Sequence, residues 1–89
     1  GKRLGVMYKG MFKNGKVFDS NMDSNKPFFF KMGNGDVVKG WDIGFEGMKV
    51  GGKRLIVCPP KMAYGKEGSP PEIPPNSVLV FEVELVNVK

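Results

Sequence analysis

The 89-residue sequence contains no histidine and only one cysteine, Cys58. Without histidine, the chain has neither a histidine general base nor a histidine ligand for a metal ion. A single cysteine excludes an intramolecular disulfide framework and a cysteine zinc cluster. Because Cys58 ends an apolar run and precedes a proline, we interpret it as a buried structural thiol rather than a nucleophile. We therefore expect no bound metal.

Long apolar runs are also missing. Apolar runs such as Phe28–Phe30 and Val78–Phe81 fall far short of the roughly 20 residues of a membrane-spanning helix, and no secretory signal pattern is present. Gly33-Asn34-Gly35 lacks the third glycine of a dinucleotide fingerprint, and no phosphate-binding loop occurs. We therefore expect no membrane partner and no cofactor.

What the chain does contain is glycine and proline, 13 and 7 of them, which indicate many turns rather than long helices. With 40% hydrophobic residues it is typical of one folded domain, residues 1–89, which we expect to be monomeric. The net charge is +5, but the basic residues are spread, with only Lys2-Arg3 and Lys53-Arg54 adjacent. We interpret them as a solvated surface rather than a dedicated nucleic-acid site.

An antiparallel hairpin is predicted near the start of the chain. Within Leu4–Phe12 the first apolar residues alternate with the two-residue period of a strand. Asn14-Gly15 then favours a type I′ turn, in which both central residues take a positive φ. Val17-Phe18 begins the returning strand.

Three further strands and one helix complete the predicted fold. The strands are expected at Phe28–Met32, Lys53–Cys58 and Val78–Val88, the last with a continuous apolar face. Between the first two, apolar residues fall at helical spacing over Val37–Met48, and Asp36 can cap the first turn. The sum is an α+β fold, an antiparallel sheet with one short helix laid across it.

A long loop, Pro59–Asn76, contains three Pro-Pro steps. A loop of this size in so small a domain tends to be functional, and its prolines restrict the conformations it can adopt. Trp41, on a glycine-rich helix facing this loop, suggests a concave apolar pocket. Composition alone favours a plain hydrophobic core for the ten aromatic residues, so both interpretations stay open at this point.

Several short motifs then occur together, in order and at consistent spacing. They are Gly15-Lys-Val-Phe-Asp-Ser20, Val37-Val-Lys-Gly-Trp-Asp42, Ala63-Tyr-Gly65, Ile73-Pro-Pro-Asn-Ser77 and Leu79-Val-Phe-Glu-Val-Glu-Leu85. Through them the whole chain resembles the FKBP family of immunophilins, peptidyl-prolyl cis/trans isomerases that bind the macrolides tacrolimus and rapamycin. The resemblance implies a half-barrel of antiparallel strands wrapped around one short α-helix. It also implies proline-containing peptides or proteins as substrates.

The resemblance assigns a role to each matching residue. Trp41 would form the floor of the pocket, and Asp19 would supply a polar contact at its edge. The backbone N–H of Ile73 and the hydroxyl of Tyr64 would bond carbonyl groups of the bound segment. Together with Phe81, these residues form the implied catalytic set. The pocket walls would be formed by Tyr8, Phe18, Phe28, Val37, Val38 and Phe81.

Rotation about an X-Pro bond makes no covalent bond, which agrees with the absence of histidine. Its barrier of about 20 kcal/mol arises from amide resonance. A twisted amide has lost charge separation, so a dry apolar pocket favours it while water favours the planar form. Two alternatives remain. One is a pure binding module that uses the same pocket without turnover, and the other is a nucleic-acid-binding barrel with aromatic residues on its surface.

A finer resemblance is to the C-terminal catalytic domains of nuclear and nucleolar FKBPs, carried by Val50-Gly-Gly-Lys-Arg54, Cys58-Pro-Pro60, Met62-Ala-Tyr-Gly65 and Gly68-Ser-Pro-Pro71. It implies histones and chromatin as partners, and a nuclear location ahead of a cytoplasmic one. Met7, Met62, Ser69 and Pro71-Glu72 depart from the commonest family pattern, so we expect a shifted peptide preference with the chemistry retained. The family domain normally starts with one more strand before the point matching Gly1, and without it we expect an open sheet edge.

Overall fold

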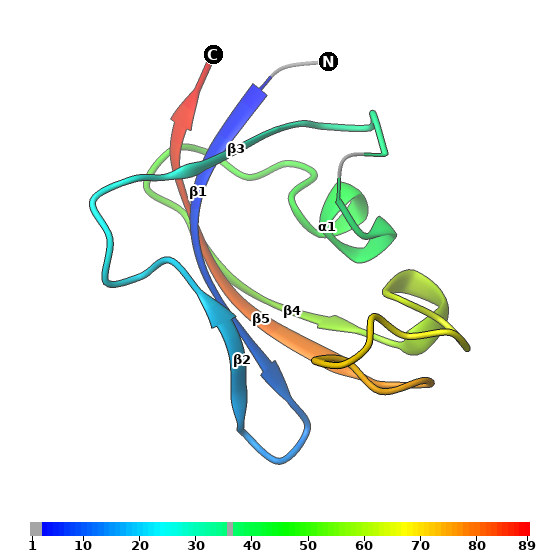
Figure 1. The fold of residues 1–89 in the computed structure, drawn as a ribbon. Coiled ribbons are helices and arrows are strands. Elements are labelled where there is room, and N and C mark those ends of the chain that lie inside the picture. Colours follow the sequence, from blue (N-terminus) through cyan, green and yellow to red (C-terminus); the bar gives the residue numbers. More distant parts are fainter. Residues whose placement is uncertain (1–2, 36) are drawn as a thin grey trace.

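The computed structural model describes residues 3–35 and 37–89, and its five strands form one antiparallel sheet that curves around a short helix (Figure 1). The helix, α1 (Lys39–Gly44), lies on the concave side of the sheet. This arrangement confirms the predicted α+β fold. The strands are β1 (Arg3–Phe12), β2 (Val17–Ser20), β3 (Phe28–Lys31), β4 (Lys53–Cys58) and β5 (Leu79–Val88).

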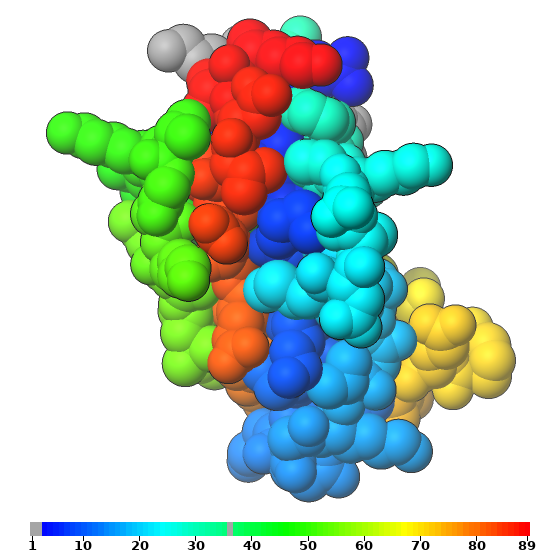
Figure 2. Space-filling model, turned by 90° about the vertical axis from the view of Figure 1, so that its left-hand side faces the viewer, coloured from blue at the N-terminus to red at the C-terminus, as the bar shows by residue number. Residues whose placement is uncertain are grey.

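The strand order in the sheet is β2-β1-β5-β4, and β3 also pairs with β1. The two long central strands, β1 and β5, pair over almost their whole length. Along the other edge of β1, β3 and β2 pair with successive parts of the strand. Figure 2 views the convex face, with β4, β5 and β1 side by side. Within the described residues no strand lies beyond β4, where Leu55 and Val57 are 60% and 59% exposed.

The hydrophobic core lies on the concave face. Along β5, apolar side chains at every second position are buried while Glu82 between them is exposed, which is the period predicted for this strand. Trp41 of α1 and Phe45 directly after it close the core from the other side. The buried cluster consists of Leu4, Val6, Phe30, Trp41, Phe45, Ile56, Cys58, Ile73, Leu79, Phe81, Val83 and Leu85.

The turn between β1 and β2 differs from the prediction. Gly15 has a positive φ of 88°, but Asn14 does not, so the type I′ prediction is wrong. The N–H of Gly15 donates to the carbonyl oxygen of Phe12, and the N–H of Phe12 donates to that of Lys16, each at 2.9 Å. These bonds close a three-residue loop in which one left-handed residue is enough, and glycine takes that position without steric cost.

α1 has six residues and is therefore shorter than the predicted helix, Val37–Met48. Gly47 adopts a positive φ of 79°, which the helical conformation does not allow. Arg54 of β4 donates a hydrogen bond to the carbonyl oxygen of Gly44, so a side chain from the sheet caps the end of the helix. The predicted cap residue, Asp36, lies outside the described residues. In the described part of the chain, no helix has the length and hydrophobicity needed to cross a bilayer.

The long loop after β4 contains two local elements that were not predicted. A 3₁₀ turn at Pro60–Met62 begins it. Further along, the N–H of Ser69 donates to the carbonyl oxygen of Ile73 at 2.8 Å, and the N–H of Ile73 donates back to that of Ser69 at 3.0 Å. These bonds hold the loop as a fixed wall opposite the sheet.

Candidate active site

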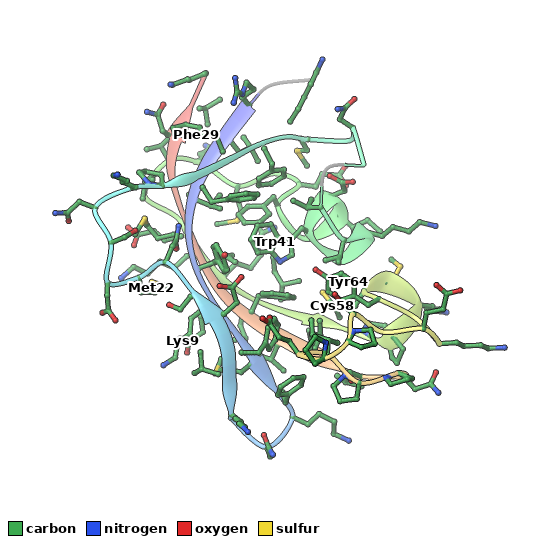
Figure 3. The ribbon with its side chains drawn as sticks, in the orientation of Figure 1. Lys9, Met22, Phe29, Trp41, Cys58 and Tyr64 are labelled. Carbon is green, nitrogen blue, oxygen red and sulfur yellow. The ribbon has the colours of Figure 1, made fainter. Side chains whose placement is uncertain are left out.

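An open cavity of about 230 Å³ lies between the concave face of the sheet, α1 and the long loop. Trp41 and Phe81 in its floor are only 4% and 5% exposed, whereas Phe28 and Tyr64 at its rim are 40% and 43% exposed. In Figure 3, Trp41 lies between the sheet and the segment that carries Tyr64. Nine of the ten residues predicted for the site line the cavity. Besides the four just named, they are Tyr8, Phe18, Asp19, Val37 and Val38.

A β-bulge places two consecutive residues of β2 in the cavity. The register of β2 against β1 shifts between Gly10 and Met11: Gly10 pairs with Asp19 and Met11 with Val17, so Phe18 is the extra residue. In a regular strand, neighbouring side chains point to opposite faces of the sheet, but here both Phe18 and Asp19 line the cavity. A Cβ at Gly10 would lie 2.7 Å from Phe18 Cζ and 2.9 Å from Phe81 Cε1, so glycine leaves room for both rings.

The indole of Trp41 is held by the edges of neighbouring rings. The centroids of Tyr8 and Phe81 lie 5.2 and 5.3 Å away, with interplanar angles of 73° and 84°, and that of Phe28 lies 6.2 Å away. Edge-to-face pairs of this kind are the favourable arrangement of aromatic rings. Nε1 of Trp41 is buried and bonds to no described residue. The floor is therefore a fixed, mainly apolar aromatic surface.

One polar pair stands at the edge of the cavity. The hydroxyl of Tyr8 donates a hydrogen bond to Oδ2 of Asp19 at 2.8 Å. Burial, the hydrogen bond to Asp19, the negative charge of Asp19 and, last, Tyr64 together raise the pKa of Tyr8 to about 12, and burial is the largest single cause. Tyr8 is therefore a neutral donor at physiological pH, and it orients the carboxylate of Asp19.

We expect Tyr8 to ionise near pH 12 in a spectrophotometric titration of the tyrosinate band. Tyr64→Phe isolates its signal and removes only the smallest of the contributions to the raised pKa. Asp19→Asn should lower this pKa only part of the way to 10, because burial, the largest single cause, remains. The raised pKa belongs to the folded state. The contribution of Tyr8 to the free energy of unfolding should therefore be complete below pH 10 and decrease as the pH rises towards 12. Ionisation of Tyr8 near pH 10 in the folded protein would contradict this structure of the pair.

The two groups predicted to donate hydrogen bonds to carbonyl groups of the ligand differ in whether they are available. Tyr64 lines the cavity, and its hydroxyl has no hydrogen-bond partner among the described residues. Ile73 is 4% exposed and is the one predicted residue that does not line the cavity. Its N–H already donates to the carbonyl oxygen of Ser69, so in this conformation it is not free to bind a ligand.

The sequence analysis missed a possible donor in the backbone of Val38. This residue lines the cavity and immediately precedes the first residue of α1. Its carbonyl oxygen accepts the N–H of Trp41 at 2.9 Å, but its own N–H donates to none of the described residues. N–H groups at a helix start lack an acceptor within the helix. A correct prediction of where the helix begins would have identified this group.

The site offers apolar contact more than acid–base chemistry. In the part of the chain that the structure describes, no cluster of three or more cysteine, aspartate or glutamate residues could hold a metal ion. The cavity has aromatic and aliphatic walls with a few hydrogen-bonding groups at its edge. Such an arrangement can enclose an apolar ring and anchor the carbonyl groups next to it.

A family profile described as FKBP-type peptidyl-prolyl cis-trans isomerase matches residues 1–86. The chain belongs to this family. It is 62% identical over 86 residues to the 39 kDa FK506-binding nuclear protein of Drosophila melanogaster, covering 96% of this chain and 24% of that protein. Over 90 residues it is 60% identical to the 46 kDa FK506-binding nuclear protein of Spodoptera frugiperda, covering 100% and 22%. Over 89 residues it is 57% identical to a peptidyl-prolyl cis-trans isomerase of Saccharomyces cerevisiae, covering 100% and 21%.

FKBP membership confirms the resemblance noted in the sequence and makes the chain a peptidylprolyl isomerase domain by class. The chain spans less than a quarter of the length of these curated relatives. The catalytic and binding roles assigned to individual residues stay predictions.

Proposed function

We propose that this FKBP domain accelerates rotation about X-Pro bonds by enclosing the prolyl amide in the aromatic cavity and removing it from water. The observation that carries the proposal is the cavity itself, with its buried indole floor and open aromatic rim. Its volume of about 230 Å³ lies below the usual range of roughly 300–1,000 Å³ for pockets that take drug-sized ligands. It suits a proline ring and the amide bond beside it.

The physical basis is the different polarity of the planar and twisted amide. Resonance gives the planar form its charge separation. Rotation interrupts the resonance, which causes the barrier of about 20 kcal/mol and removes the charge separation from the twisted form. Transfer from water to an apolar cavity therefore destabilises the planar form more than the twisted one. Such differential stabilisation lowers the barrier, whereas equal binding of both forms would lower the free energies of the planar and twisted amide by the same amount.

Hydrogen bonds at the edge of the cavity would hold the peptide while the bond rotates. The hydroxyl of Tyr64 and the N–H of Val38 belong to lining residues and have no partner among the described residues, so they would bond carbonyl groups on either side of the proline. The N–H of Ile73 would join them only if its bond to Ser69 opens. Asp19, oriented by Tyr8, would contribute a negative charge at the rim.

Ligands and location are proposed from the relatives. Tacrolimus or rapamycin would compete for the same cavity, since two relatives are named FK506-binding proteins, and both are also named nuclear. We infer proline-containing proteins as substrates and a nuclear location for the longer protein. Histone tails are candidate partners.

The test is an NMR exchange measurement on a proline-containing peptide. Uncatalysed isomerisation takes tens of seconds or longer, so exchange between cis and trans signals at catalytic protein concentration indicates turnover. A macrolide should abolish it and alter the fluorescence of Trp41. Peptide binding without exchange would instead assign a binding module. Salt-dependent binding of single-stranded nucleic acid without peptide exchange would favour the nucleic-acid-binding barrel. The burial of Trp41 argues against that alternative, which needs aromatic residues on the surface.

A further inference from the structure

Two residues of β1 beside the cavity have no strand partner on one edge. On that edge β3 pairs with Arg3–Val6 and β2 pairs with Lys9–Met11. The chain between β2 and β3 bulges away from the sheet, where Met22 is labelled on the left of Figure 3. Met7 and Tyr8 therefore face the interval between the two short strands. Unpaired backbone groups in such an interval are costly unless another group bonds to them.

The side chain of Asn21 fills this interval. Its Oδ1 accepts the N–H of Tyr8 at 2.6 Å, and its Nδ2 donates to the carbonyl oxygen of Val6 at 3.0 Å. Its own backbone N–H donates to the carbonyl oxygen of Tyr8 at 3.1 Å. A carboxamide offers an acceptor on its oxygen and two donors on its nitrogen, and the N–H of Tyr8 and the carbonyl oxygen of Val6 fix which atom is which. Asn21 thus replaces one rung of the missing strand.

This rung adjoins three residues of the cavity. Tyr8, whose backbone it binds, contacts Trp41 at 5.2 Å and Phe28 at 6.1 Å between ring centroids. Asp19, the acceptor of the Tyr8 hydroxyl, lies two residues before Asn21. A longer contact of 3.4 Å joins Nδ2 to the carbonyl oxygen of Lys26, shortly before Phe28.

We infer that Asn21 is a positioning residue of the isomerase site, which fixes Tyr8, Asp19 and Phe28 against one another through its bonds to β1. The inference rests on the proposed function, because a positioned site matters for rate only if the domain catalyses. Without the amide, Tyr8 and the start of β3 lose their common anchor. The wall would then widen without losing any group that touches substrate.

The test compares Asn21→Ala with Asn25→Ala, an exposed asparagine of the same loop for which the structure gives no hydrogen bond. Asn21→Ala should reduce kcat/KM for an X-Pro peptide by about three- to tenfold, the effect of losing one or two hydrogen bonds. It should also lower the pKa of Tyr8 from about 12 towards 10, because water reaches the ring. Asp19 and Tyr64 are the other groups that act on that pKa. Asn25→Ala should change neither quantity.

Asn21→Asp keeps the acceptor for the N–H of Tyr8 but sets a carboxylate oxygen against the carbonyl oxygen of Val6, so its kcat/KM should stay below that of the wild type. In the wild type, the Nδ2 protons of Asn21 should exchange with water more slowly than those of Asn25, which tests the bonds even if a variant does not fold. An unchanged kcat/KM or an unchanged Tyr8 pKa in folded Asn21→Ala overturns the inference, as does fast exchange at Asn21. Absence of turnover in the wild type would overturn the proposed function instead, and the Tyr8 titration would still report on Asn21.

Discussion

Replacing Trp41 by leucine should reduce kcat/KM for an X-Pro peptide by about ten- to a hundredfold, equivalent to roughly 1.4–2.8 kcal/mol of transition-state stabilisation. Leucine keeps the floor apolar but removes the flat surface against which Tyr8, Phe28 and Phe81 are fixed. The cavity then becomes deeper and admits water, which favours the planar amide. NMR exchange measured per folded molecule would quantify the loss.

Phe45→Leu is the matched control for this change. Phe45 is as buried as Trp41 and contacts it at 5.4 Å between ring centroids, but it does not line the cavity. Both variants should lose about 1–3 kcal/mol of stability, as is typical when an aromatic side chain in a core is shortened. Only Trp41→Leu should lose most of its activity. Equal losses of activity in the two variants would mean that the indole acts through stability alone and would contradict the desolvation mechanism.

The strands could be predicted because their signal is local. In β5, apolar side chains at every second position are buried while Glu82 between them is exposed, and the alternation along the sequence records this directly. In β4 the burial alternates too, but Leu55 and Val57 on its exposed face are apolar, so the sequence shows an apolar run without alternation. The extent of α1 was predicted less well, because apolar spacing continues past Gly44 while the helix does not. Its end depends on Arg54, a contact from β4 that no local pattern contains.

The cavity residues could be assembled from the sequence only through the family motifs. Periodicity indicated that Trp41 faces inward, but core and pocket have the same pattern. Two features that shape the site remained hidden. The bulge that turns both Phe18 and Asp19 inward and the amide rung of Asn21 exist only once β1 and β2 are paired. The hydrogen bond between Ile73 and Ser69 likewise depends on how the long loop folds back on itself.

Gly40→Ala should destabilise the protein by about 1–3 kcal/mol, the usual cost of overpacking a core. This is the reverse of the ordinary effect, since replacing glycine by alanine within a helix normally increases stability by roughly 1 kcal/mol. Gly40 is buried in α1, and a Cβ there would collide with Sγ of Cys58 and lie 3.3 Å from the carbonyl oxygen of Met62. Urea unfolding would measure the change. Ile43→Ala, at a 55% exposed position of the same helix, should stay within about 0.5 kcal/mol of the wild type.

A double mutant separates this steric cause from a general weakness of α1. Cys58 is fully buried and burial raises the pKa of its thiol, which supports its interpretation as a structural residue. Cys58→Ala removes the Sγ atom in the path of the new methyl group, so the pair Gly40→Ala and Cys58→Ala should be more stable than the sum of the single losses predicts, by about 0.5–3 kcal/mol. Strict additivity would show that the sulfur is not the obstacle. The expected coupling would show that glycine precedes Trp41 because α1 must approach β4 closely enough to set the indole at the floor of the cavity.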